Sequence, residues 1–163
     1  MMIRQVHPEN VLIWKNIRLE AIKLHPEAFG GSFEEESQQS DADFASQLEK
    51  NVIFAAFENG EIGGCVGFFS FQPLKLRHRG TLFSMYVKQA QRGTGLSDQL
   101  VQTVLNYAHS RVRQVHYTVV TTNETAKRLY ERHGFVVYGT EPRSLRIGPV
   151  FYDEHLMVNR LVH

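Results

Sequence analysis

The sequence predicts an α/β fold in which a central mixed β-sheet is covered by helices. The middle of the chain holds three consecutive strand-like segments, at residues 52–58, 62–71 and 81–87. After them the apolar pattern changes to a helical period, and strand-like and helical segments alternate up to the C-terminus. A meander followed by β-α-β-α-β places antiparallel and parallel neighbours in one sheet.

The length and composition fit one ordinary domain covering residues 1–163. Hydrophobic residues make up 42% of the chain and charged residues 21%, which is enough apolar material for a core and argues against general disorder. The formal net charge is only +1. Because nucleic acids and anionic membranes bind basic surfaces, neither is expected as a partner.

Cysteine and histidine patterns exclude several kinds of site. Cys65 is the only cysteine, so an intrachain disulfide and a cysteine-based zinc site are both excluded. We expect Cys65 to be a small buried hydrophobic residue rather than a nucleophile. No HExxH pair occurs, and we expect no metal. The N-terminus lacks an apolar signal core and no apolar run reaches 18 residues, so a cytoplasmic protein is expected.

The N-terminal third is expected to contain one short strand followed by helices. Residues 3–6 form the strand. A helix opens at Asn10 and ends before Pro26, with Trp14, Ile17, Ala21 and Leu24 on one face. The polar, acidic stretch 27–51 is expected to hold one or two short helices, anchored by Phe33, Phe44 and Leu48.

A three-stranded meander follows. The first two strands are joined at Asn59-Gly60, a dipeptide that favours the positive φ angles of a two-residue hairpin turn. The second strand leads into a basic loop at residues 73–80, which contains Arg77-His78-Arg79 and is expected to be solvated.

The last third alternates helices and strands. One helix carries an apolar face from Leu96 to Ala108, and a strand is expected at 115–121. A short helix then ends at Gly134, which suits a left-handed stop. Two final strands are expected at 135–140 and 151–158, joined by a loop that contains Pro142, Gly148 and Pro149.

The stretch 85–97 is the most informative for function. A strand ends at Val87, a loop of small residues follows, and a helix begins near Leu96. A helix start presents unpaired N–H groups and a positive dipole end, and glycine lets an anion approach the backbone. These features predict a phosphate-binding cradle at residues 92–97, although the glycines could also serve only a turn. Neither a Walker loop nor a GxGxxG fingerprint is present.

A second segment, 123–135, has the pattern of a short helix after a strand. Asn123 suits a helix cap, while Leu129 and Tyr130 suit packing positions. These structural roles leave a functional role for Tyr130 open.

Together the two segments resemble a known family. Arg92-x-x-Gly95-x-Ser97 resembles the Q/R-x-x-G-x-G/A acetyl-CoA signature of the GNAT superfamily of N-acetyltransferases. Asn123-x-x-Ala126-x-x-Leu129-Tyr130-x-x-x-Gly134-Phe135 resembles the second motif of that family. Two positions depart from the pattern. Ser97 replaces the usual Gly or Ala, and the region 80–83 lacks the glutamate that many relatives carry.

The resemblance implies a GNAT-type sheet with a splay between the parallel strands 81–87 and 115–121. Acetyl-CoA would bind at this splay, with the Val87 N–H pointing at the thioester oxygen and the pyrophosphate resting on residues 92–97. The cofactor-binding residues it implies are Met85, Tyr86, Val87, Arg92, Gly93, Thr94, Gly95, Leu96, Ser97, Asn123, Ala126 and Tyr130.

The resemblance also implies transfer of an acetyl group from acetyl-CoA to a primary amine by direct attack in a ternary complex. Tyr130 would donate a proton to the departing thiolate, and Phe29, Phe33 and Phe83 would line the acceptor site. A small-molecule amine is the leading substrate. A protein or peptide amine and a catalytically silent acyl-CoA-binding module are the alternatives, and a homodimer is a family expectation.

The sequence leaves the proton acceptor undecided. Six residues are candidates to receive the proton of the amine, directly or through water, and none has a spacing that singles it out: Glu34, Glu35, Glu36, His116, Asp153 and Glu154. The run Glu34–Glu36 is interpreted first as a solvated helix face.

Overall fold

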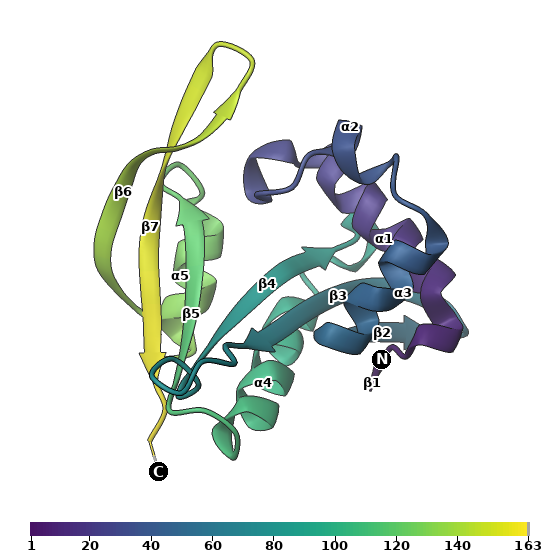
Figure 1. The fold of residues 1–163 in the computed structure, drawn as a ribbon, viewed down its shortest axis with the longest axis horizontal. Coiled ribbons are helices and arrows are strands. Elements are labelled where there is room, and N and C mark those ends of the chain that lie inside the picture. Colours follow the sequence, from purple (N-terminus) through teal and green to yellow (C-terminus); the bar gives the residue numbers. More distant parts are fainter. Residues whose placement is uncertain (163) are drawn as a thin grey trace.

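The computed structural model describes residues 1–162 as one seven-stranded mixed sheet with helices on both faces (Figure 1). The strand order is β1-β2-β3-β4-β5-β7-β6. Short 3₁₀ turns lie at Pro8–Asn10, Pro26–Ala28 and Gln89–Gln91. The main elements are β1 (Met2–Gln5), α1 (Val11–Leu24), α2 (Phe33–Glu36), α3 (Asp41–Lys50), β2 (Val52–Glu58), β3 (Glu61–Ser70), β4 (Arg79–Val87), α4 (Leu96–His109), β5 (Gln114–Val120), α5 (Glu124–Arg132), β6 (Val136–Ile147) and β7 (Val150–Arg160).

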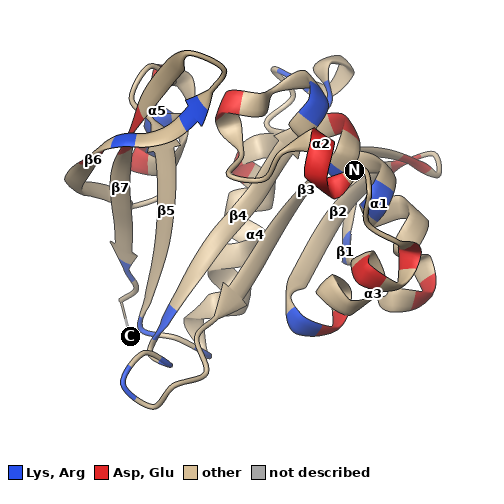
Figure 2. Ribbon diagram, turned by 45° about the horizontal axis from the view of Figure 1, so that its top comes forward, with Lys and Arg blue, Asp and Glu red and all other residues tan. Residues whose placement is uncertain are grey.

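Helices α1, α2 and α3 form a layer on one face of the sheet. Trp14, Ile17 and Ala21 lie on the buried side of α1, which faces β2 and β3, as the helical spacing predicted. Leu24, expected on the same face, is the last residue of α1 and is 59% exposed. A capping box begins α3, because the Ser40 hydroxyl accepts from the Asp43 N–H and the Asp43 carboxylate accepts from the Ser40 N–H. Acidic residues are concentrated on α2 and α3 (Figure 2), and all of them except Glu36 are exposed.

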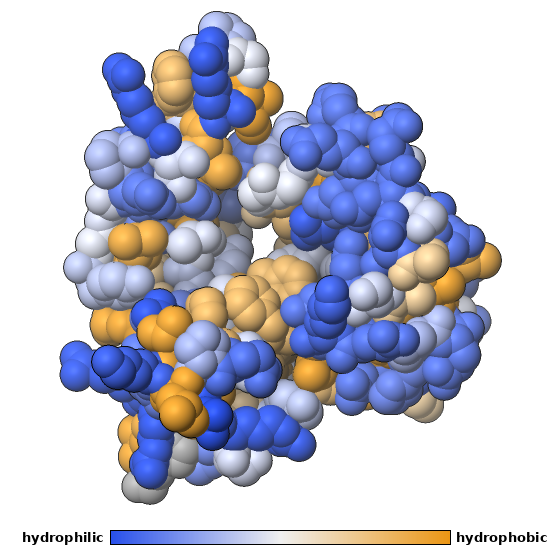
Figure 3. Space-filling model, viewed as in Figure 1, coloured by the Kyte–Doolittle hydropathy of each residue, from blue (hydrophilic) through white to orange (hydrophobic). Residues whose placement is uncertain are grey.

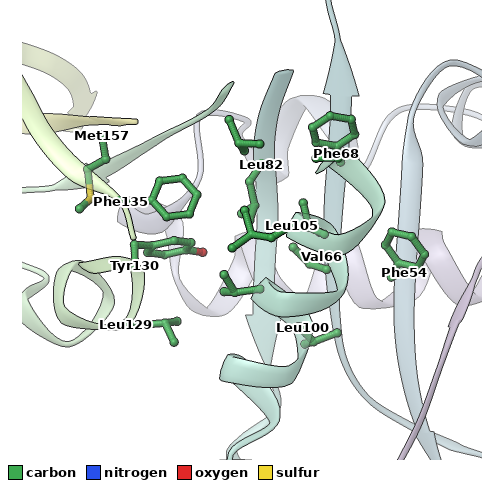
Figure 4. Packing of buried hydrophobic residues seen from close by; sticks show 14 of the residues in the cluster. Phe54, Val66, Phe68, Leu82, Leu100, Leu105, Leu129, Tyr130, Phe135 and Met157 are labelled. Carbon is green, nitrogen blue, oxygen red and sulfur yellow. The ribbon is translucent and has the colours of Figure 1, made fainter. Parts of the chain in front are cut away.

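Helices α4 and α5 cover the opposite face. Leu100, Val101 and Val104 are fully buried against the sheet, and Figure 4 shows Leu100 and Leu105 of α4 beside Val66 and Leu82. Each face therefore has its own apolar cluster. Among the helices of residues 1–162, none is long and apolar enough to cross a membrane.

The meander agrees closely with the sequence prediction. Strand β2 spans the predicted residues, and the hairpin to β3 turns at Asn59 (φ 52°) and Gly60 (φ 80°). Both residues have the positive φ angles that this turn requires. Residues 73–78 of the basic loop are exposed, as predicted. Arg79 is half-buried instead, because it pairs with Gln114 of β5 and begins β4 two residues earlier than predicted.

The final hairpin differs from the prediction. The loop expected between 140 and 151 is mostly strand, since β6 continues to Ile147 and β7 begins at Val150. Pro142 sits at a register shift between Glu141 and Leu145, where the ladder is interrupted. A bulge tolerates a residue without an N–H, and so the proline does not end the strand. The hairpin projects beyond the rest of the sheet (Figure 1).

Candidate active site

Strands β4 and β5 separate soon after they start. Their parallel pairing covers only Arg79–Thr81 opposite Gln114–His116. Beyond that point β4 pairs with β3 alone, while β5 continues along β7. The Met85–Val87 backbone therefore has a free edge that faces the gap. The splay predicted between these two strands is present.

A cavity of about 680 Å³ opens at this gap, between the end of β4, the first turns of α4 and α5, and the segment 25–29. A hollow is visible there in the space-filling view (Figure 3). Most residues expected to hold the cofactor line the cavity: Met85, Tyr86, Val87, Arg92, Gly93, Gly95, Leu96, Ser97, Asn123 and Ala126. Thr94 and Tyr130 do not line it.

The start of α4 forms the floor of this cavity and has the features of an anion cradle. Gly93 and Gly95 have φ angles of 79° and 84°, which side-chain-bearing residues rarely adopt. Gly95 is the N-cap of α4, and no side chain caps this end of the helix. The first N–H groups of α4 are thus left for another acceptor.

Two side chains shape the loop before α4. The Thr94 hydroxyl donates to the Gln91 carbonyl oxygen at 2.6 Å, so it fixes the turn instead of lining the cavity. Arg92 is exposed at the mouth, where its Nη2 lies 3.1 Å from His25 Nε2. This contact joins the loop before α4 to the end of α1.

Asp98 ties the start of α4 to the end of α5. Arg132 Nη2 and His133 Nε2 lie 3.1 and 2.8 Å from Asp98 Oδ1. Partial desolvation acts to raise the pKa of Asp98, but hydrogen bonds from His133 and Arg132 outweigh it and leave the pKa below its usual value. Asp98 and Arg132 both line the cavity, so a cation stands beside the cradle.

Tyr130 lies behind the cavity wall formed by Ala126 and Leu129. Its side chain is completely buried, stacked on Tyr117 with ring centroids 3.9 Å apart and edge-on to Phe135. Within residues 1–162 its hydroxyl makes no hydrogen bond of good geometry, and the Tyr117 hydroxyl is its polar neighbour. Figure 4 shows the hydroxyl directed from α5 toward the side of Leu82 and Leu105. Burial raises the pKa of Tyr130 well above its ordinary value, and so the hydroxyl stays protonated.

Asn123 is the N-cap of α5. Its Oδ1 accepts from the Ala126 N–H at 3.1 Å, the capping role that its residue type suggested. Asn123 also lines the cavity, so capping does not remove it from the site.

The geometry suits acetyl-CoA, whose diphosphate needs N–H donors and whose pantetheine arm needs amide partners. The cradle supplies the donors, the free edge of β4 supplies the amides, and Tyr130 supplies a buried hydroxyl. No three His, Cys, Asp or Glu side chains in residues 1–162 are gathered so that they could hold a metal ion.

Comparison with known proteins decides the family. The model of the acetyltransferase (GNAT) family matches residues 18–135, which is most of the chain. The chain belongs to the GNAT family. It is an acetyl-CoA-dependent N-acetyltransferase, as the two sequence motifs predicted.

Similar proteins include a putative phosphinothricin acetyltransferase of Bacillus subtilis, 25% identical over 120 residues that cover 72% of this chain and 74% of the relative. An L-methionine sulfoximine/L-methionine sulfone acetyltransferase of Pseudomonas aeruginosa is 30% identical over 94 residues, 56% of this chain and 54% of the relative. The crystal structure of a GNAT-family acetyltransferase from Streptococcus pneumoniae superposes with a TM-score of 0.86, at 25% identity and 97% and 98% coverage. The yncA structure from Salmonella typhimurium, which contains acetyl-CoA, shares the fold with a TM-score of 0.86, at 20% identity and 100% and 95% coverage.

The three phenylalanines expected to line the acceptor site of this GNAT enzyme do not lie together. Phe29 is buried and lines the main cavity. Phe83 lines a second cavity of about 400 Å³ between α1, α2, α3 and β4. Phe33 borders neither cavity and packs beneath Lys23, whose Nζ lies 5.3 Å from the ring centroid.

Two charged residues lie close to β4. Arg18 was not predicted to belong to the site, and Glu36 was predicted as a candidate proton acceptor on a solvated helix face. Arg18 of α1 makes a two-point ion pair with Glu36 at 2.9 and 2.8 Å, and both side chains are only 12–13% exposed. The interpretation of Glu34–Glu36 as a solvated face is therefore wrong for Glu36, whereas Glu34 and Glu35 are exposed. A usable signal existed, since Arg18 lies four residues after Trp14, beside the apolar stripe of α1.

The other candidate proton acceptors are partly engaged. Asp153 accepts from the Arg143 N–H at 2.8 Å, and Glu154 accepts from the Ser144 hydroxyl. Desolvation, with help from Arg79 and His78, lowers the pKa of His116. Cys65 is fully buried as expected, and burial raises the pKa of its thiol to about 12. At neutral pH that thiol is therefore not an ionised nucleophile.

Proposed function

We propose that this GNAT enzyme transfers the acetyl group of acetyl-CoA to the primary amine of a small molecule, by direct attack in a ternary complex. The observation that supports it is the cavity at the β4–β5 splay, where a free strand edge meets a helix start that no side chain caps. The buried Tyr130 hydroxyl lies behind the wall of this cavity.

The cofactor in this proposal lies along β4 and ends at α4. Its diphosphate accepts from the N–H groups at residues 95–98, with the Arg92 and Arg132 guanidinium groups at the mouth. The pantetheine arm pairs with the free edge at Met85–Val87. The Val87 N–H donates to the thioester oxygen and stabilises the negative charge that develops there during attack.

The proposed reaction requires the amine and the thioester to be held in one orientation. The amine must first lose a proton, because the pKa of an alkylamine is roughly 10. Its lone pair attacks the thioester carbonyl carbon, a C–N bond forms, and the C–S bond breaks. The departing thiolate takes a proton from the Tyr130 hydroxyl, which is protonated at neutral pH because burial raises its pKa. The nitrogen of the new amide loses one proton to water, and the Tyr130 oxygen regains one from water. Holding the two reactants together supplies much of the acceleration.

A small-molecule acceptor is favoured by two relatives, both of which are named as acetyltransferases of amino-acid analogues. The phosphinothricin relative spans most of this chain, and the methionine sulfoximine relative about half of it. We therefore expect an acceptor that carries a primary amine next to a carboxylate.

The experiment measures thiol release from acetyl-CoA over a panel of amines. The panel contains amino-acid analogues, their decarboxylated counterparts and short peptides with free N-termini. We expect turnover with one or more amino-acid analogues and weaker turnover with the matched amines.

Calorimetry with acetyl-CoA separates binding from turnover. Acetyl-CoA binding without turnover of any amine would favour a silent acyl-CoA-binding module. Turnover confined to peptides would replace the small-molecule proposal by a peptide N-acetyltransferase. Absence of acetyl-CoA binding would overturn the proposed site.

A further inference from the structure

Residue 84 of β4 has a backbone conformation that its side chain does not favour. Ser84 has a φ angle of 54°, in the left-handed region, and is 5% exposed. The register between β3 and β4 shifts at the same place, since Gly67 pairs with Phe83 but Cys65 pairs with Tyr86. One extra residue is thus accommodated in β4 as a bulge.

The bulge changes which residues face the coenzyme cavity. Leu82 belongs to the cluster on the α4 side, whereas Phe83 packs on the α1 side. Ser84 also points to the α1 side, where Arg18 bonds it, so the alternation of the strand is broken once. Met85 and Val87 return to the α4 side and Tyr86 to the α1 side.

Hydrogen bonds hold the strained residue from two directions. Arg18 Nη1 donates to Ser84 Oγ at 2.9 Å, and the Cys65 thiol donates to the Ser84 carbonyl oxygen at 3.4 Å. Arg18 is itself fixed by its two-point ion pair with Glu36, and its guanidinium lies 5.4 Å from the centroid of the Phe29 ring. A planar guanidinium binds the carboxylate at two points and Ser84 with a third N–H in one fixed geometry, which the compact ammonium group of lysine cannot reproduce.

We propose that Arg18, Glu36 and Ser84 form a positioning cluster, which holds the β4 bulge so that the Met85–Val87 amides meet the acetyl-CoA thioester. This inference rests on the proposed function, because it assigns the cluster to that reaction. Ser84 borders neither cavity, and Arg18 and Glu36 border only the second one. The cluster therefore acts through the backbone of β4 and not by contact with the coenzyme.

The test compares Ser84→Ala with Ser84→Gly. Both variants lose the hydroxyl, but glycine adopts a positive φ angle without strain and alanine does not. We expect Ser84→Ala to lower kcat by about 10- to 100-fold, as a misplaced reacting group does, and Ser84→Gly to recover a large part of that loss. Arg18→Lys should behave like Ser84→Ala.

Several outcomes would overturn the positioning role. Equal losses of kcat in Ser84→Ala and Ser84→Gly would mean that the hydroxyl itself takes part in the chemistry. A lower unfolding temperature with unchanged kcat at 25 °C would mean that the cluster serves stability alone. Unchanged kcat and stability in Ser84→Ala would mean that the hydroxyl does neither.

A crystal structure of Ser84→Ala separates this inference from the proposed function. We expect residue 84 to leave the left-handed region and the Met85–Val87 backbone to shift. That result can be read even if no amine is turned over, in which case only the proposed function fails. A residue 84 that keeps its positive φ angle in Ser84→Ala would overturn the positioning cluster whatever the activity.

Discussion

The Tyr130 hydroxyl is fully buried and makes no hydrogen bond of good geometry, which normally costs stability. The ring is well packed, so the cost falls on the oxygen alone. The proposed role of Tyr130 as proton donor to the thiolate would account for this oxygen. Under this proposal, the Tyr130 hydroxyl lowers the stability of the fold but increases the rate of the reaction.

Replacement of Tyr130 by phenylalanine separates the two. We expect Tyr130→Phe to lower kcat by about 10²–10⁴-fold, because the thiolate loses its proton donor. Unfolding by denaturant should show equal or higher stability. Tyr107→Phe is the matched control, since Tyr107 packs on Phe54 and Phe68 outside the cavity. Equal kcat values for the Tyr130→Phe variant and the wild type would contradict the proton-donor role.

Residue 31 is glycine because a neighbouring side chain leaves no room for a Cβ atom, and not because of its φ angle. A Cβ at this position would lie 1.8 Å from Glu36 Oε2 and 2.8 Å from Arg18 Nη2. We expect Gly31→Ala to displace the Glu36 carboxylate and to cost about 1–3 kcal/mol, the worth of a hydrogen bond to a charged group. Thermal or denaturant unfolding measures it.

The neighbouring glycine provides the control for that measurement. Gly30→Ala meets nothing within 4 Å, so its free energy of unfolding should match that of the wild type. Equal stabilities of the Gly30→Ala and Gly31→Ala variants would show that the ion pair adapts without loss.

At the scale of elements, the contact between α4 and α5 depends on Asp98. The Asp98 carboxylate makes ion pairs with Arg132 and His133 at the end of α5. It lies in the first turn of α4, where a negative charge interacts favourably with the helix dipole. Its lowered pKa means that the folded state prefers the ionised form. This contribution is present above the unfolded value of 3.8 and is lost as the pH falls through the lower folded value.

The lowered pKa of Asp98 predicts how the stability of the Asp98→Asn variant depends on pH. We expect the variant to be less stable than the wild type near neutral pH. The difference in unfolding temperature should shrink as the pH is lowered below the unfolded value of 3.8. Thermal melts at a series of pH values measure it. A difference that stays constant down to strongly acid pH would show that Asp98 acts through packing and not through its charge.

For the whole molecule, stability comes from two apolar clusters on opposite faces of one sheet. Phe44 of α3 is completely buried in the cluster beneath α1 and α3, and Leu82 belongs to the cluster beneath α4. Because both clusters share the strands between them, we expect the molecule to unfold as one unit.

A substitution far from the site tests whether the two clusters unfold together. Phe44→Ala should lower the free energy of unfolding by about 3–5 kcal/mol, because it leaves a cavity. Leu12→Ala, on the same layer but 56% exposed, should change it by less than about 0.5 kcal/mol. Circular dichroism and tyrosine fluorescence would report one common transition. Two separate transitions in Phe44→Ala would show that the α1–α3 layer unfolds on its own.

Most elements were predictable because their patterns are local. The helical spacing in α1 and α4, the Asn59-Gly60 turn and the glycines before α4 depend on neighbours in sequence. The full length of the β6–β7 hairpin could not be predicted. In the sequence, Pro142 indicates the end of a strand, but in the structure a bulge against β7 accommodates it. Glu36 was misjudged for a similar reason, since its partner Arg18 lies 18 residues away.

The sequence by itself determined the family, and it predicted acetyl-CoA and the segments proposed to bind it, because helix starts, glycine turns and the two motifs are written in consecutive residues. Tertiary structure alone decided that Ser84 has a positive φ angle, that Arg18 bonds both Ser84 and Glu36, and that the Tyr130 hydroxyl makes no hydrogen bond of good geometry. These features arise where segments distant in the chain meet. Their geometry depends on packing, which no local pattern records.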